Sequence, residues 1–199
     1  MISLKRKSKS HLICGSLLVI VGILIFIFPI IYNKYQEKQE EIKLEYFFEV
    51  STIDNYNVIK DTKQEDYIAV LEIPSINLKK GLYAIDSKNN NVNKNIEIID
   101  SSDMPDITKG NFILAGHSGT GRIAFFDDLD KLIVDDTIIV YYKNIKYIYQ
   151  INNIESIVKD GTIEIKREFE GMITLTTCNQ KNKNEQLVIT GILISKENY

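Results

Sequence analysis

A long apolar run near the N-terminus constrains the fold more than any other feature of this sequence. Residues 12–32 contain no charged side chain, and about 20 apolar residues are enough for a helix to cross the hydrocarbon core of a bilayer. A segment in lipid must satisfy its own backbone hydrogen bonds, so it has to be a helix. A cleaved signal peptide usually has a shorter apolar region that ends on small residues. This run ends with Phe28, Pro29 and Ile30, and we therefore expect an uncleaved transmembrane anchor.

The charges around this run predict its orientation and the divisions of the chain. Residues 1–11 form a basic tail with Lys5, Arg6, Lys7 and Lys9, and basic residues stay on the cytoplasmic side of a membrane. Everything after residue 32 is then extracellular, in a single-pass cell-membrane protein. Residues 33–66 begin charged and helix-friendly and then lose their pattern, so we expect a helical stalk and linker before a folded unit at 67–199.

The folded unit has the pattern of short strands. Apolar and β-branched runs alternate with turn residues from Tyr67 onward, without the strand–helix alternation of a parallel α/β fold. The pattern predicts strands at 68–73, 96–99, 112–115, 137–142, 145–154, 171–178 and 187–194, and a strand pair at 76–85. It also predicts a short amphipathic helix at 123–132. The expected fold is mainly β, and a closed barrel would leave no exposed sheet edge.

Outside the predicted anchor, the chain has one thiol and one imidazole. Its two cysteines are Cys14 and Cys178 and its two histidines are His11 and His117, and Cys14 and His11 belong to the membrane end. A lone cysteine is more often a small buried residue than a nucleophile. Here, however, both Cys178 and His117 end an apolar strand, and a thiol beside an imidazole is a nucleophile–base pair. The spacing of these residues fits no metal site, and the net charge of −3 with a pI near 5.5 argues against nucleic acid.

These residues resemble the sortase family. The resemblance rests on the motif TLxTC, on a histidine in an Ala-Gly-His segment 61 residues before the cysteine, and on two further segments. The motif is Thr174-Leu175-Thr176-Thr177-Cys178, and the further segments are Leu71-Glu72-Ile73-Pro74-Ser75-Ile76 and Phe125-Phe126-Asp127-Asp128-Leu129-Asp130-Lys131-Leu132. The family fold is an eight-stranded β-barrel, in agreement with the strand pattern. The resemblance does not assign a subfamily.

The resemblance implies cysteine transpeptidation on the outer face of a Gram-positive membrane, without a cofactor. Cys178 would attack the carbonyl after the Thr of an LPxTG-like sorting signal, and a cell-wall precursor or pilin amine would release the thioacyl product. The chemistry is reasonable because a free thiol is mostly protonated at neutral pH, so a neighbouring imidazole or cation must stabilise the thiolate. His117, once protonated, can then protonate the leaving amine. Thr177 is expected to line the site.

One family feature is missing. Sortases carry an arginine near the start of the strand after the cysteine, where it holds substrate and stabilises the oxyanion, but this chain has no arginine after Arg167. Gln186 occupies that position, and its amide can donate a hydrogen bond without bringing charge. We rank Gln186 first as the neutral donor. Arg122 or Lys183 could instead reach in from a loop.

Two other functions remain open from the sequence. Water could be the main acceptor, which would make the protein a cell-surface cysteine peptidase. Because of the missing arginine, the domain could also be a catalytically weak barrel that binds sorting signals without turning them over.

Overall fold

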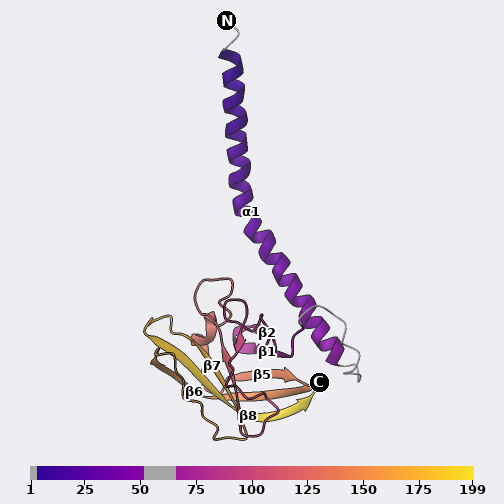
Figure 1. Cartoon of the computed structure of the whole chain (residues 1–199), viewed down its shortest axis with the longest axis vertical. Helices are drawn as coiled ribbons and strands as arrows, with labels where there is room; N and C mark the ends of the chain where they lie inside the picture. Colours follow the sequence, from indigo (N-terminus) through magenta and orange to yellow (C-terminus); the bar gives the residue numbers. More distant parts are fainter. Residues whose placement is uncertain (1–3, 52–65) are drawn as a thin grey trace. The chain divides into compact units, whose positions relative to one another are not determined.

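The computed structural model describes residues 4–51 and 66–199. The chain divides into two compact units, residues 1–42 and 43–199. Helix α1 (Leu4–Ser51) begins in the first unit and ends in the second (Figure 1). The segment Ile13–Val50 of this helix is long and apolar enough to cross a membrane by length and composition. Residues 33–51 of the expected stalk are helical, whereas residues 52–65 of the expected linker lie outside the described part of the chain.

The second unit is a mainly β domain, as the sequence predicted. Its strands are β1 (Ala69–Ile73), β2 (Leu78–Leu82), β3 (Glu97–Ile98), β4 (Gly110–Ala115), β5 (Thr137–Tyr142), β6 (Ile145–Val158), β7 (Gly171–Cys178) and β8 (Glu185–Asn198). They form one eight-stranded sheet in the order β2-β1-β5-β6-β8-β7-β4-β3, which curls into a nearly closed barrel (Figure 1). The two edge strands are linked indirectly, since Nδ2 of Asn95 donates a 2.7 Å hydrogen bond to the β2 carbonyl of Gly81.

Alternating apolar residues place the core inside this barrel. In β7, Ile173 and Leu175 belong to this core and are fully buried, and Met172 and Thr174, which point to the opposite face of the strand, are buried as well. The largest buried side chains of the same core include Phe112, Tyr147 and Tyr149. Burial raises the pKa of the Tyr149 phenol well above its usual value.

A tight hairpin sets the register between β5 and β6. Lys143 and Asn144 both have positive φ angles, 49° and 60°, as a two-residue turn that follows the twist of antiparallel strands requires. Tyr142 of β5 therefore pairs with Ile145 of β6. β6 then continues to Val158, beyond the predicted end at residue 154, and this extension reaches the site described below.

Two local predictions were wrong. Residues 76–85 hold one strand, β2, and not a strand pair, because the 3-10 helix η1 (Pro74–Ile76) and Asn77 at φ 52° form the turn between β1 and β2. The apolar spacing at 123–132 predicted a longer helix than the one observed. Only the 3-10 helix η2 (Asp127–Lys131) forms there, and it buries Leu129.

Candidate active site

The parallel pairing of β4 with β7 brings the predicted thiol and imidazole to one end of the barrel. Ala115 pairs with Thr176 at the end of the ladder, and the amide of Gly116 continues it by donating to the Thr176 carbonyl at 3.2 Å. The same register, followed two residues beyond Ala115 and Thr176, sets His117 level with Cys178. Two residues 61 positions apart in the sequence thus lie at adjacent strand ends.

Two hydroxyl groups hold these strand ends together. The Thr177 hydroxyl donates to the Gly116 carbonyl at 2.8 Å, and the Ser118 hydroxyl donates to the Cys178 carbonyl at 2.7 Å. Thr177 is buried. One bond runs from β7 to the residue after β4, and the other runs back from the next segment to β7. Together they fix the backbone on either side of His117 and next to Cys178.

The backbone and ring of His117 are held from two further sides. Its carbonyl accepts a 3.0 Å hydrogen bond from the Phe126 amide, just before η2. Its Nε2 lies 3.2 Å from Oδ1 of Asn93, in the segment between β2 and β3. An amide oxygen accepts such a bond only when Nε2 carries a proton. This contact orients the imidazole of a half-buried histidine.

Gln186 lies directly opposite Cys178 in the antiparallel pairing of β7 with β8. The position inferred from the family pattern is therefore beside the thiol-bearing residue. The side chain amide is used elsewhere, because Nε2 of Gln186 donates a 2.7 Å hydrogen bond to the Thr162 carbonyl. In this arrangement Gln186 holds the β6–β7 loop (residues 159–170).

The cation that contacts the thiol is a residue that the sequence argument did not consider. Nζ of Lys159 lies 3.1 Å from Sγ of Cys178. Lys159 follows the end of β6, and its amide donates to the Asn184 carbonyl at 2.8 Å, which extends the pairing of β6 with β8 by one residue. Arg122 and Lys183, the cations considered from the sequence, are both exposed, and Lys183 belongs to the β7–β8 loop (residues 179–184).

The start of the β6–β7 loop is ordered by its own side chains. The carboxylate of Asp160 accepts hydrogen bonds from the Thr162 hydroxyl at 2.6 Å and the Thr162 amide at 2.9 Å. These bonds hold the pKa of Asp160 below its usual value. Gly161 between them has φ 88°, a conformation that favours glycine. Lys159 therefore precedes a defined turn.

The far end of the same loop is attached to the segment before β4. Nε of Arg167 donates to the Asp103 carboxylate at 2.7 Å, and the Asn111 amide donates to the same oxygen at 3.0 Å. The bond from the Asn111 amide, followed by that from Arg167, lowers the pKa of Asp103. The buried Asn111 side chain donates to the Lys166 carbonyl and accepts from the Thr174 hydroxyl. This end of the loop thus lies against β4 and β7, at the start of β4.

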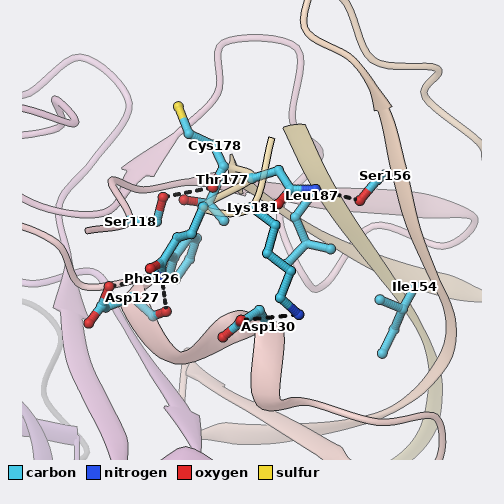
Figure 2. A pocket seen from close by; sticks show the side chains of 12 residues that line it. Ser118, Phe126, Asp127, Asp130, Ile154, Ser156, Thr177, Cys178, Lys181 and Leu187 are labelled. Carbon is cyan, nitrogen blue, oxygen red and sulfur yellow. Dashed lines mark hydrogen bonds and ion pairs between the residues drawn. The ribbon is translucent and has the colours of Figure 1, made fainter. Parts of the chain in front are cut away.

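A cavity of about 140 Å³ lies next to Cys178. An engineered cavity of about 150 Å³ binds benzene, so this one can hold roughly one side chain. It is lined by the apolar side chains of Phe126, Ile154 and Leu187, by the carboxylates of Asp127 and Asp130 in η2, and by polar residues of the β7–β8 loop, among them Lys181. Figure 2 shows the sulfur of Cys178 directed away from Asp130 and Ile154. The cavity therefore lies beside the strand end that carries Cys178, which is one of its lining residues.

Sequence reasoning missed Lys159 and Ser118. Lys159 belongs to no motif and lies 19 residues before the cysteine, two strands away in the sheet. The signal that could have found it is the strand pattern of β6, which continues through Glu155, Ser156, Ile157 and Val158 and ends just before Lys159 and an Asp-Gly turn. Ser118 directly follows the histidine, and only the strand pairing shows that it contacts the cysteine carbonyl.

Comparisons with known proteins agree with this geometry. The family model described as "Sortase domain" matches residues 71–194. A Bacillus anthracis protein named sortase A is 25% identical over 209 residues, covering 95% of this chain and 97% of that protein.

Solved structures show the same similarity. A Clostridium perfringens sortase D5 transpeptidase superposes with a TM-score of 0.62 at 25% identity, covering 78% of this chain and 98% of that one. Sortase C1 from Streptococcus agalactiae has a TM-score of 0.57 at 27% identity, covering 71% and 73%. The barrel, its paired strand ends and the family match agree, and the chain belongs to the sortase family of cysteine transpeptidases.

Proposed function

We propose that this protein is a membrane-anchored transpeptidase that cleaves an LPxTG-like sorting signal through a thioacyl intermediate on Cys178. An amine of a cell-wall precursor or of a pilin then accepts the acyl group. The observation that carries the proposal is the parallel pairing of β4 with β7, which ends at Ala115 and Thr176, each two residues before His117 and Cys178. Membership of the sortase family supports the reaction class.

The proposed reaction has two acyl-transfer steps. The Cys178 thiolate attacks the carbonyl carbon after the Thr of the signal, and the electron pair of the C=O bond moves to oxygen. When the carbonyl re-forms, the C–N bond breaks and protonated His117 gives its proton to the leaving amine. In the second step the acceptor amine attacks the thioester, His117 takes up its proton, and the thiolate leaves. Protons and electrons balance without a cofactor.

The contacts around the two residues suit this reaction. The hydrogen bonds of Thr177 and Ser118 fix the backbone of both strand ends, which reduces the reorganisation needed for attack. Asn93 holds Nε2 of His117, so the ring can keep its orientation as protons move. We assign Thr177 a structural role because its hydroxyl is committed to the Gly116 carbonyl.

We propose that α1 anchors the barrel as a single-pass helix with the N-terminus in the cytoplasm. The segment Ile13–Val50 has sufficient length and hydropathy, and the basic residues at 5–9 precede it. Basic residues favour the cytoplasmic side. The catalytic unit would then be extracellular, where sorting signals of surface proteins and cell-wall amines are found.

Product analysis tests this function and separates it from the alternatives. The full chain in detergent micelles is incubated with an LPxTG-type peptide library, with and without an amine such as triglycine, and products are identified by mass spectrometry. We expect a new amide joining the Thr carboxyl of the signal to the added amine, and no such product from Cys178→Ala. Hydrolysis that is unchanged by amine would identify a peptidase. Peptide binding without any product would identify a binding barrel.

A further inference from the structure

The thiol of this sortase has a cationic neighbour, although the family's arginine position holds Gln186. We propose that Lys159 is a catalytic residue whose ammonium group pairs with the Cys178 thiolate and takes the place of the missing arginine charge. The inference rests on the proposed function for its role in turnover. Its physical basis is the 3.1 Å contact between Nζ of Lys159 and Sγ of Cys178.

The strand order explains how Lys159, which directly follows β6, can contact Cys178 at the end of β7. The strand order places β8 between them, and on β8 Gln186 pairs with Ile157 on one side and Cys178 on the other. Paired residues share a face of the sheet, and so do residues two apart in a strand. Lys159, two residues after Ile157, therefore lies on the face of Cys178.

Two neighbouring hydrogen bonds fix the backbone position from which the Lys159 side chain extends to Cys178. The Gln186 amide is directed to the Thr162 carbonyl and thereby holds the loop that begins at Lys159. The Lys159 amide is bonded to Asn184. A long, flexible lysine side chain thus starts from a fixed backbone position, and Gln186 acts as a positioning residue for the loop.

The contact has a clear chemical consequence. A thiol is the weak form of the nucleophile, and an adjacent cation favours the thiolate. Lys159 neither gives nor takes the proton that His117 transfers. When the thiolate attacks, the S–C bond forms and the negative charge leaves sulfur for the carbonyl oxygen.

The expected size of the effect can be estimated from general chemistry. Removal of the neighbouring ammonium charge leaves less of the thiol in its reactive form. The thiolate that remains is more reactive, because nucleophilicity rises with basicity at a Brønsted slope of about 0.4–0.5, and this offsets part of the loss. We expect a net reaction rate of the thiol that is roughly threefold lower at pH 7.

The test is thiol alkylation, which needs neither a sorting signal nor an amine. The full chain with Cys14→Ala is treated with iodoacetamide at pH 7 in detergent micelles, and modification of the Cys178 peptide is followed by mass spectrometry. We expect Lys159→Met to lower the rate about threefold, Lys159→Arg to keep it, and 1 M NaCl to reduce the difference, because salt screens exposed charges. Lys196→Met, which removes an equal charge at a β8 position over the Tyr147 ring, is the control and should not change the rate.

A second, independent test moves the positive charge to residue 186, the arginine position of the family. Lys159→Met combined with Gln186→Arg should regain the alkylation rate lost in the single variant, since an arginine on β8 lies opposite Cys178. An alkylation rate of Lys159→Met equal to that of the parent, with both proteins folded by circular dichroism, would overturn the inference. A parent that alkylates as expected but never forms transpeptidation product would overturn only the proposed function.

Discussion

The attachment of the β6–β7 loop at Asp103 makes a quantitative prediction about stability. Asp103→Ala removes the acceptor of both the Asn111 amide and Arg167. Asn111 is 1% exposed, and a buried donor left without a partner costs about 1–3 kcal/mol. The ion pair adds about 0.2–1 kcal/mol, at the low end because the Arg167 side chain is 42% exposed. We expect a loss of about 2 kcal/mol in the free energy of unfolding.

Asp103→Asn removes the negative charge of Asp103 but keeps a hydrogen-bond acceptor at the same position. The amide oxygen can still accept from the Asn111 backbone amide, but this bond and the one from Arg167 lose the carboxylate charge, so we expect a loss of only about 1 kcal/mol at pH 7. The folded-state pKa of Asp103 is lowered, whereas an unfolded aspartate titrates near about 3.9. The contribution of the charge is therefore complete above that unfolded pKa and is lost as the pH falls through the lower folded pKa. Below both values Asp103→Asn should match the parent.

Thermal unfolding measured by near-ultraviolet circular dichroism is a suitable assay, because the chain has 11 tyrosines and no tryptophan. A change of 1 kcal/mol shifts Tm by about 2–4 °C for a domain of this size. We expect shifts of about 6 °C for Asp103→Ala and about 3 °C for Asp103→Asn at pH 7. A Tm of Asp103→Ala within 1 °C of the parent, or an Asp103→Asn shift that persists undiminished at low pH, would refute the reasoning.

Three further predictions concern the surroundings of the site. Gly116→Ala should lower turnover at least about tenfold, because the added Cβ would lie 2.8 Å from the Phe126 ring; Gly121→Ala, with open space around it, is the control, and equal rates for both would contradict this. Asn111→Ala should lower the free energy of unfolding by about 2–3 kcal/mol in urea titration, because it disrupts a buried polar network; an unchanged midpoint would argue against that network. Gln186→Ala should lower the alkylation rate of the thiol by about twofold or more, because it removes the amide that holds the β6–β7 loop; a rate equal to that of the parent would mean that the loop needs no such support.

The sequence predicted a strand well where turn residues mark both of its ends. β5 and β7 begin and end where expected, since each is a β-branched run bounded by turn residues. β6 is longer than predicted because its last residues pair with the polar start of β8, as Val158 does with Glu185, and β8 is longer because both of its polar ends pair with β6. Polar strand ends carry no apolar pattern from which they could be predicted. Residues 76–85 carry apolar residues on both sides of Gly81, but only tertiary pairing with β1 shows that one strand forms.

The site shows the same division between local and non-local information. The motif and its spacing identify Cys178, His117 and the arginine position at Gln186, and β pairing then places Gln186 opposite the cysteine. The sequence cannot show where the Gln186 amide points, because that depends on the Thr162 carbonyl in another loop. For the same reason Lys159 could not be predicted: its contact with the thiol depends on the order of three strands.

The central claim, that Cys178 forms a thioacyl intermediate, is tested most directly by the mass of its peptide. The Cys14→Ala full chain is mixed with an LPxTG-type peptide without amine, quenched in acid, digested and analysed by mass spectrometry. We predict that the Cys178 peptide gains the mass of the signal up to its Thr, and that added triglycine discharges it. His117→Ala should give no adduct. If Cys178 remains unmodified across a library of signals, although iodoacetamide alkylates it readily, the account is contradicted.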